Sequence, residues 1–484
     1  MRPQQPVRDR NTSLWQSAVR ETFRRRNDAA ALQARLEHST SLQAQASVNG
    51  RNLEALAKAA FPNDADAQNK AIANAHASDL AFQAAGAQAD NAAAQATLLQ
   101  KVRDLVANYS DWDLIGWAQC GLRYIEYYIA AHATPAYRYW DQNNPRSIAF
   151  GTIDFKLPAT CKVLIVGDWG THMDDNVALL RQALKKFKPD VILHLGDVYY
   201  SGTVAECTDN VLSVMDALIK ELAISPRPPF YSIPGNHDYY SGGAGFFSMI
   251  DKVNATLPAA CQQKASYFCL RTEDNQWQFL AMDTGLNDRN PVDHIAPALE
   301  KSERIWHQDK LDNFGGTTIL LSHHQLFSAN DPLTRGVRPY LNGALNEVFR
   351  PYYDRIAAWF WGHEHNLVIF KDNQLFEDTV ALKKGRLVGC SAYEEAQNTD
   401  PYAINPACAA VGYADPMPRL GISDYKSPTQ TFYNHAFTLL EVAPDNIVAK
   451  YYEYPSWDQD YKPNPEPEIS GPIHTENIPA IRRP

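Results

Sequence analysis

The sequence lacks the features that would place the protein in a membrane, on nucleic acid or in a secretory route. It has no uncharged apolar run of about 18 residues, the length a membrane-spanning helix needs, and its nearest candidate, residues 114–131, contains Arg123 and Glu126. The first residues have no apolar leader segment. The net charge is -10, whereas general nucleic-acid binding requires a basic surface. We therefore expect no membrane span, no general nucleic-acid binding and a cytoplasmic location, with export by another route left open.

Cysteine is sparse and carries no metal-binding pattern. The 484 residues include seven cysteines, an odd number, and no Cys-x-x-Cys occurs. This usage is typical of reduced thiols inside a cell. A bridge between Cys261 and Cys269 stays open.

The N-terminal region, residues 1–145, is rich in Ala, Gln and Asn and poor in β-branched residues. Apolar residues recur there at helical spacing, which predicts two or three long helices followed by a Trp- and Tyr-rich helix. Such a region either only covers the surface of the next domain or forms a homo-oligomer or protein-partner interface. We expect activity on a small aryl phosphate to survive deletion of residues 1 to about 105, because the site motifs begin later, at Asp168.

From residue 146 to 455, short β-branched runs alternate with amphipathic segments, the pattern of an α/β domain. Residues 174–187 form a helical pattern that places Val177, Leu180, Leu184 and Phe187 on one stripe. Residues 435–455 predict a hairpin that turns at Pro444 to Asn446. The Pro-rich tail, residues 456–484, is expected to be extended or loosely packed.

Polar residues follow five of the predicted strands at the point where each strand ends. In chain order these ends are Gly167-Asp168, Gly196-Asp197-Val198-Tyr199-Tyr200, Gly235-Asn236-His237-Asp238, Ser322-His323-His324 and Gly362-His363-Glu364-His365. The carboxyl edge of an α/β sheet is where ligands bind, and a preceding glycine lets the backbone turn sharply there. Carboxylate, amide and imidazole groups are ligands for Fe, Mn or Zn. They are too many for one ion, so the sequence predicts two metal ions about 3.5–4 Å apart that share one carboxylate.

The order of these motifs resembles the calcineurin-like metallophosphoesterase superfamily, and most closely the purple acid phosphatases, over roughly residues 160–455. The resemblance implies two packed mixed β-sheets flanked by helices, here preceded by the N-terminal helical region. It assigns Asp168, Tyr200 and His365 to the first metal, Asn236, His323 and His363 to the second, Asp197 to both, and His237 to the substrate. Where most of the superfamily has a metal-binding histidine, this chain has Gly170, and Tyr200 stands where purple acid phosphatases place a tyrosinate on ferric iron. The resemblance thus implies iron at the Tyr200 site and Fe, Mn or Zn at the second.

Several neighbouring residues have open roles. His172 is a rival ligand for the first metal, and Tyr199 is expected to point elsewhere because it breaks the Asp-x-x-Tyr spacing. Asp238 is expected to orient His237. His324 and Asp283 are candidates for a supporting layer around the ligands, with a turn-capping carboxylate as the equal alternative for Asp283.

The resulting functional hypothesis is a metal-dependent phosphoester hydrolase acting on a small substrate. Hydroxide activated by the two metals would attack phosphorus, while His237 stabilises charge or protonates the leaving group. Monoester and diester substrates both remain open. The alternative is a helical scaffold protein that retains a metal-binding domain without catalysis, and hydrolysis of p-nitrophenyl phosphate discriminates between the two.

Overall fold

The computed structural model describes residues 134–139, 151–199, 201–288, 297–328, 333, 340–373, 382–391, 400, 402, 419–422, 431–457 and 464–481. The chain divides into two units, residues 1–121 with 426–431 and residues 122–425 with 432–484, and the elements below belong to the second. The helices predicted in the N-terminal region and Tyr200 lie outside the described residues. Within the described part of the chain, no helix combines the length and apolarity needed to cross a membrane.

Thirteen described strands form two sheets. The seven-stranded sheet has the order β1 (Lys156–Leu157), β5 (Phe268–Thr272), β6 (Trp277–Ala281), β7 (Thr317–Ser322), β8 (Ile356–Trp361), β10 (Gly385–Val388), β9 (Leu367–Ile369). The six-stranded sheet has the order β13 (His474–Pro479), β12 (Asn446–Tyr454), β11 (His435–Ala443), β2 (Cys161–Val166), β3 (Val191–His194), β4 (Phe230–Ser232). Both sheets mix parallel and antiparallel pairs, as the fold prediction requires.

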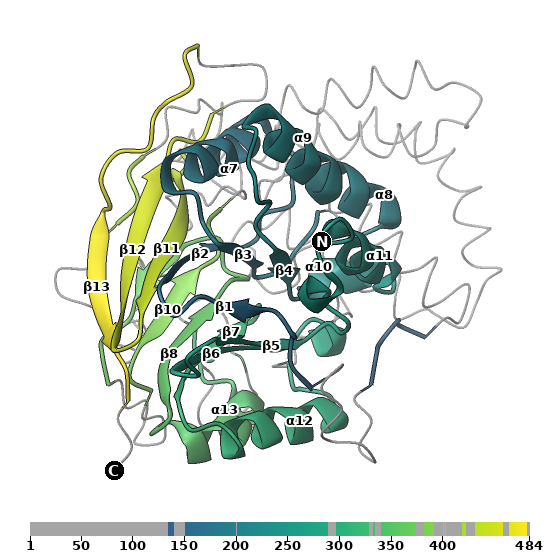
Figure 1. Ribbon diagram of the computed structural model, residues 1–484, viewed down its shortest axis with the longest axis vertical. Helices are drawn as coiled ribbons and strands as arrows, with labels where there is room; N and C mark the ends of the chain where they lie inside the picture. Colours follow the sequence, from purple (N-terminus) through teal and green to yellow (C-terminus); the bar gives the residue numbers. More distant parts are fainter. Residues whose placement is uncertain are drawn as a thin grey trace, which may run out of the picture. The chain divides into compact units, whose positions relative to one another are not determined.

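Helices cover the outer faces of the two sheets (Figure 1). The longer ones are α7 (Asp174–Phe187), α9 (Ser213–Glu221), α11 (Ala244–Val253), α12 (Lys301–Asp312) and α13 (Gly343–Phe349), and the short ones include α8 (Val204–Cys207) and α10 (Asn236–Tyr240). In Figure 1, α7 and α9 lie on the side of β2 to β4, and α12 and α13 lie on the side of β5 to β8. One buried apolar cluster contains side chains from both sheets, including Ile165, Tyr231, Phe279 and Phe360. The two packed sheets flanked by helices predicted above are therefore confirmed.

Helix α7 has the predicted bounds but a slightly rotated buried stripe. Leu180, Leu184 and Phe187 are buried, as expected, whereas Val177 is only partly buried and Ala183 takes part in the core instead. Acidic residues in its first turn and lysines in its last turn complement the helix dipole. A helix that packs on a twisted sheet buries a broad face, so its edge positions are the least predictable.

Of the two forms expected for the C-terminal tail, extended or loosely packed, residues 474–479 adopt the extended one. The predicted hairpin is present as β11 and β12, and residues 474–479 then add β13 antiparallel to β12. The strand was hard to recognise because, of its six residues, only Ile478 is buried. A strand with one buried residue in six carries a weak apolar signal.

Five of the seven cysteines lie among the described residues, and all five are buried free thiols. They include Cys261 and Cys269, so the disulfide bridge between them that the sequence left open does not form.

Candidate metal centre

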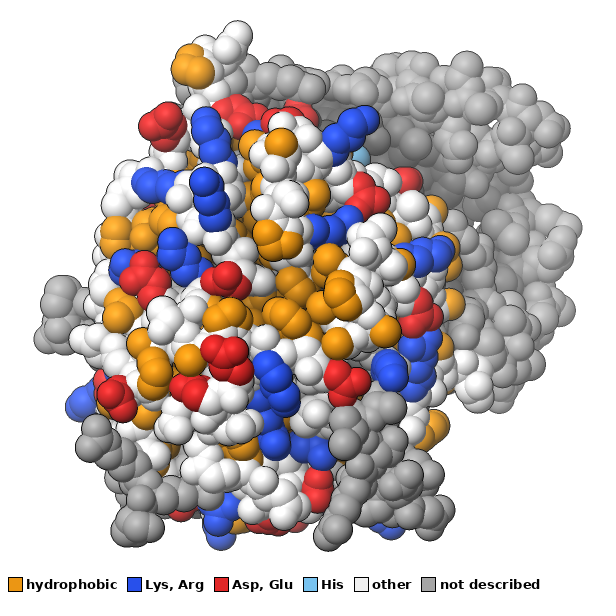
Figure 2. All heavy atoms as spheres, viewed as in Figure 1, with side chains coloured by type: hydrophobic (Ala, Val, Ile, Leu, Met, Phe, Trp, Pro, Cys, Tyr) orange, Lys and Arg blue, Asp and Glu red, His pale blue; other side chains and the backbone are white. Residues whose placement is uncertain are grey.

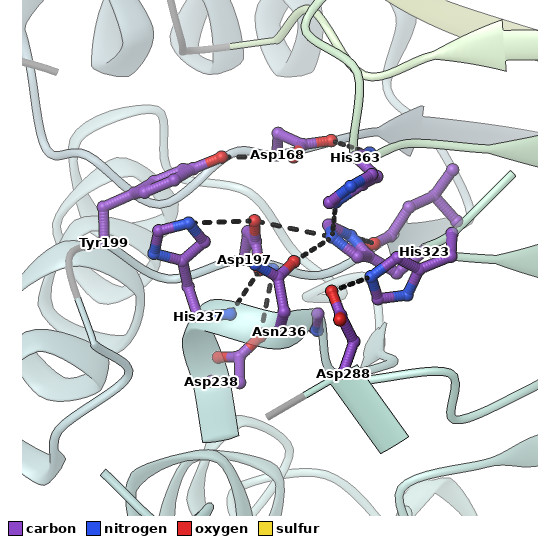
Figure 3. A network of polar contacts seen from close by, with 12 residues as sticks. Asp168, Asp197, Tyr199, Asn236, His237, Asp238, Asp288, His323 and His363 are labelled. Carbon is purple, nitrogen blue, oxygen red and sulfur yellow. Dashed lines mark hydrogen bonds and ion pairs between the residues drawn. The ribbon is translucent and has the colours of Figure 1, made fainter. Parts of the chain in front are cut away.

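The polar residues predicted at five strand ends meet at one edge of the two sheets. Strands β2, β3 and β4 run parallel to one another, as do β7 and β8, so their carboxyl ends face the same way. These ends contribute Asp168, Asp197, Asn236, His237, His323, His363 and His365, all 5% exposed or less. Figure 3 labels all of these residues except His365, and shows the labelled ones turned toward one another from separate turns and from the start of helix α10, Asn236–Tyr240.

Three of the predicted ligands lie in strained backbone. The φ angles of Asp168, Asp197 and His363 are 57°, 68° and 71°. Residues other than glycine rarely adopt this left-handed region, and such strain concentrates at functional sites. At these turns the side chains of Asp168 and Asp197 approach the histidines of other strand ends.

Two glycines allow neighbouring turns to approach Asp197 closely. A Cβ at Gly235 would lie 2.0 Å from Asp197 Oδ1, and one at Gly170 would lie 2.6 Å from the carbonyl oxygen of Asp197. The second distance means that no side chain fits at position 170 without moving the turn that carries Asp197.

The first group of donors surrounds Asp168. Its Oδ2 accepts a hydrogen bond of 2.8 Å from the backbone N–H of His363, while its Oδ1 lies 3.4 Å from His365 Nε2. The hydroxyl of Tyr199 lies 3.1 Å from the same Oδ1 and 2.9 Å from His365 Nε2. The expectation that Tyr199 points elsewhere is therefore wrong: its phenol sits between the two residues assigned to the first metal.

The second group of donors surrounds His323. Its Nδ1 lies 2.8 Å from the carbonyl oxygen of Leu195, which only accepts, so Nδ1 carries the hydrogen and the Nε2 lone pair faces the cluster. That Nε2 lies 3.1 Å from Asn236 Oδ1, 3.1 Å from His363 Nδ1 and 3.4 Å from Asp197 Oδ2. The amide of Asn236 is fixed in this orientation because its Nδ2 donates to Tyr240 Oη at 2.7 Å.

This donor set fits metal ions. Lone pairs of imidazole, amide and carboxylate converge in a buried space, which is unfavourable unless a cation lies among them. Ligand atoms of Asp168, Asp197 and His323 all lie within 4.8 Å of one another, as do those of His323, His324 and His363. Asp197 thus stands between the group around Asp168 and the group around His323, where a shared carboxylate would be needed.

His237 lies beside Asp197 rather than among the donors. Its ring Nε2 is 3.9 Å from Asp197 Oδ2, and its backbone N–H donates to Asp197 Oδ1 at 3.0 Å. The imidazole packs between the rings of Tyr199 and Tyr240, with centroids 4.8 Å and 4.7 Å away. These aromatic contacts fix the ring at the rim of the cluster.

Asp238 has a different contact from the one expected. Its Oδ2 accepts hydrogen bonds from the backbone N–H groups of Asp197 and Gly235, at 2.9 Å and 2.8 Å, instead of holding the ring of His237. Burial raises the pKa of Asp238 to about 7, against which these backbone hydrogen bonds act. Through these two hydrogen bonds Asp238 connects the turn that carries Asp197 to the turn that carries Asn236.

His324 is held by two residues that the sequence did not single out. Its Nε2 lies 3.0 Å from Asp288 Oδ2, and its Nδ1 lies 2.8 Å from Thr284 Oγ1, which also accepts from the backbone N–H of His324. Burial lowers the pKa of His324 to about 3, so the ring is neutral. Its centroid lies 4.3 Å from that of His363. Asp288 belongs to a short 3₁₀ helix, Leu286–Asp288, for which the sequence offers no motif.

The remaining two candidates stand apart from the donors. Asp283 accepts hydrogen bonds from Tyr239 Oη, at 2.7 Å, and from the backbone N–H of Leu286, so it caps the turn after β6. His172 is exposed on the loop before α7, whereas the donors are buried. A rival metal-binding role for His172 has no support from this placement.

Comparison with known proteins identifies the family. Residues 161–367 match the family described as calcineurin-like phosphoesterase, a range that holds every donor described above. This part of the chain is a calcineurin-like phosphoesterase domain.

Solved structures show distant likeness to this phosphoesterase domain and its surroundings. "Structure of PhoD" is 11% identical with a TM-score of 0.40, and covers 62% of this chain and 67% of that one. A hypothetical protein from Thermus thermophilus is 13% identical with a TM-score of 0.30, covering 61% of this chain and 100% of its own. Vacuolar Protein Sorting 29 from Cryptosporidium parvum is 13% identical with a TM-score of 0.28, covering 66% and 98%. No curated protein matches this chain.

Proposed function

We propose that the protein hydrolyses phosphoesters of small molecules at a dinuclear metal centre of the purple acid phosphatase type, with iron at the first position. The family match supports a metal-dependent phosphoester hydrolase. The observation that carries the dinuclear proposal is the convergence of lone pairs on both sides of Asp197, around Asp168 and around His323. The proposal includes a cytoplasmic location, and leaves an oligomer or partner interface in residues 1–145 as a prediction.

Each side chain has a distinct task in this proposal. Asp168 and His365 would hold the first ion, Asn236, His323 and His363 the second, and Asp197 both. Bound metal ions would supply hydroxide at neutral pH and neutralise charge on the phosphoryl oxygens. His237 would donate a hydrogen bond or a proton to the phosphoester, because its ring stands at the rim and is held by two tyrosines. His324 and Asp288 would keep the ring of His363 in place.

The identity of the first metal depends on a tyrosine ligand. A phenol with an ordinary pKa of about 10 ionises easily only on a strongly Lewis-acidic ion such as ferric iron. Tyr200 has the spacing of the family ligand, while the hydroxyl of Tyr199 lies at the Asp168 and His365 position. Both are therefore candidates for the ligand.

A paired substitution tests the iron proposal. Iron-loaded, oxidised protein should be pink to violet, because ferric tyrosinate absorbs visible light. Tyr199→Phe and Tyr200→Phe are compared by their visible spectrum and iron content, and the variant that loses the colour identifies the ligand. A colourless iron-loaded wild type would exclude iron tyrosinate while leaving the hydrolase proposal intact.

The activity itself is tested with p-nitrophenyl phosphate and its bis ester, with Fe, Mn or Zn added and after chelation. Metal-dependent release of p-nitrophenol is expected. The scaffold alternative predicts bound metal without turnover, and the six predicted carboxylate, amide and imidazole ligands, which are all present and buried, argue against it.

A further inference from the structure

A cavity of about 810 Å³ opens at the end of the six-stranded sheet that lies opposite the metal donors. Its walls are the turns that precede β3 and β4 and the turn Leu257–Cys261, so it adjoins the amino ends of the strands whose carboxyl ends carry Asp197 and Asn236. Figure 2 shows hydrophobic side chains gathered at the centre of this face, where the segment from α9 to β4 passes in Figure 1. The volume is that of a binding site for a small organic molecule.

The wall of the cavity is apolar and stiff. Pro226, Pro228 and Pro229 line it within one short segment, and Leu222 and Leu257 contribute aliphatic surface. Proline fixes its own φ angle and restricts the residue before it, so this wall keeps its shape without a ligand. A preformed apolar hollow lowers the entropic cost of binding a rigid apolar group.

The charge around the cavity is positive, against the trend of the chain. Four cations line it, Lys156, Lys185, Lys188 and Arg227, with Asp190 as the single acid, in a protein of net charge -10. The acid already accepts a hydrogen bond of 2.7 Å from the backbone N–H of Lys162, and Arg227 pairs with Asp216 at 2.6 Å. The three lysines form no ion pair with the described residues, which leaves an excess of positive charge beside an apolar wall.

Burial also lowers the pKa of Lys156, because its ammonium group is partly removed from water and lies near Arg271. An anion at the cavity would offset that desolvation. The apolar wall therefore favours an apolar group, and the lysines favour an acidic group beside it.

We propose that this cavity binds a small amphipathic anion, with an apolar ring system against the proline wall and a single acidic group toward the lysines. The site is separate from the proposed hydrolytic centre and does not rest on it.

The test uses two probes on the full-length protein. 8-Anilinonaphthalene-1-sulfonate has an apolar ring system and one sulfonate, and N-phenyl-1-naphthylamine is the same body without the charge. Saturable binding of the sulfonate at one site per chain is expected by fluorescence, with the neutral probe weaker by about tenfold, or about 1.4 kcal/mol. Equal affinity for the two probes would overturn the proposal, as would absence of saturable binding.

Three variants locate the probe. Ala260→Trp fills the cavity and should abolish binding of both probes. Lys185→Gln with Lys188→Gln changes two exposed side chains, so folding is not at risk, and should weaken only the sulfonate, by about tenfold. Lys220→Gln on α9 removes an exposed lysine outside the cavity and should change nothing. Unchanged sulfonate binding in the lysine double variant would place the probe elsewhere.

Two measurements separate this site from the metal centre. Chelation of metal should leave probe binding unchanged, and the lysine variants should hydrolyse p-nitrophenyl phosphate as the wild type does. Loss of the probe on chelation would mean that the sulfonate occupies the metal centre, and would overturn the proposal without touching the proposed hydrolysis.

Discussion

Two buried polar clusters of this protein show opposite balances of donors and acceptors. Around Asp197 and His323, lone pairs face one another. Around Arg386 on β10, every guanidinium nitrogen donates: to Glu476 and Asp372 at 2.6–2.7 Å and to the carbonyl oxygens of Phe370 and Gly385. The Arg386 cluster, which joins the two sheets through Glu476 on β13, is complete without a ligand. The cluster around Asp197 instead brings acceptor atoms of several residues to one place, a set that a cation would complete, and this marks it as the candidate functional site.

The comparison predicts that a change in the cluster around Asp197 costs function and not stability. Asp197→Asn should lower metal content and reduce hydrolysis by more than about 10³-fold, because the residue would contact both ions. The metal-free variant should unfold no earlier than metal-free wild type, since one repelling charge is gone. Metal analysis, turnover of p-nitrophenyl phosphate and urea unfolding measure the three quantities. Full activity with two bound ions would contradict the assignment.

His237→Ala separates the substrate side of the same cluster from its metal side. The variant should keep both ions and lose about 10²–10⁴ in rate, the range for general acid catalysis. Rate and metal content are measured on the same preparation. His324→Ala is the matched control, because His324 contacts His363 and should disturb metal binding first. Loss of metal from His237→Ala would mean that His237 is a ligand.

The strand ends of this cluster were predictable because each apolar run stops at polar residues, which a glycine precedes in four of the five cases. The same reasoning predicted wrongly that Tyr199 points away from the cluster. Asp197 has a φ of 68°, and that turn redirects the residues after it, so spacing alone does not tell where Tyr199 points. Thr284 and Asp288 belong to a turn whose geometry depends on the packing of β6 and α12, which no local pattern encodes. Strand β13 was missed because its single buried residue, Ile478, gives no periodicity.

A change in the Arg386 cluster should reduce stability and leave hydrolysis unchanged. Arg386→Met removes two hydrogen bonds to Glu476 and leaves Lys384, 2.8 Å away, as the remaining cation beside this carboxylate, so the free energy of unfolding should fall by about 3 kcal/mol. Hydrolysis and metal content at 25 °C should match the wild type, because this cluster contributes no donor to the site. Adding Glu476→Leu should recover part of the loss, since the carboxylate that kept only Lys384 as a cationic partner is then removed. Impaired metal binding in Arg386→Met would break the distinction between the clusters.

The same cluster predicts an acid limit to stability. Burial alone would raise the pKa of Glu476, but the hydrogen bonds and charge of Arg386 outweigh it and lower the pKa to about 2. The ionised carboxylate therefore stabilises the fold above pH 4.5, and this contribution, about 3 kcal/mol by the size of the shift, is lost as the pH falls toward 2. Glu476→Gln should be less stable at pH 7 and show a flatter loss between those values in urea titrations. A loss as steep as that of the wild type would assign the acid limit to other carboxyl groups.

A third cluster tests why acidic residues alone do not make a metal centre. Glu303 on α12 is fully buried, accepts from Tyr137 Oη and the backbone N–H of Asp283, at 2.7 Å and 2.8 Å, and lies 3.1 Å from His307 Nε2. Burial raises the pKa of Glu303 to about 8, so near neutral pH this carboxyl keeps its proton instead of requiring a cation.

Tyr137→Phe should therefore have the smallest of these effects. Because the pKa of Glu303 is raised in the folded protein, its protonated carboxyl group stabilises the fold fully below pH 4.5, the pKa in the unfolded chain. This stabilisation is lost as the pH rises through about 8, the pKa in the folded protein. The phenol donates to the ionised form, so its removal should lower the free energy of unfolding by about 1 kcal/mol at pH 8 and by less at pH 5. Urea unfolding at the two pH values measures this, with Tyr139→Phe on the same segment as the control, because Tyr139 is exposed. Equal destabilisation at both pH values would show that the carboxyl is already ionised at pH 5. Protonation of Glu303 would then not explain why this cluster, unlike the proposed metal centre, needs no cation.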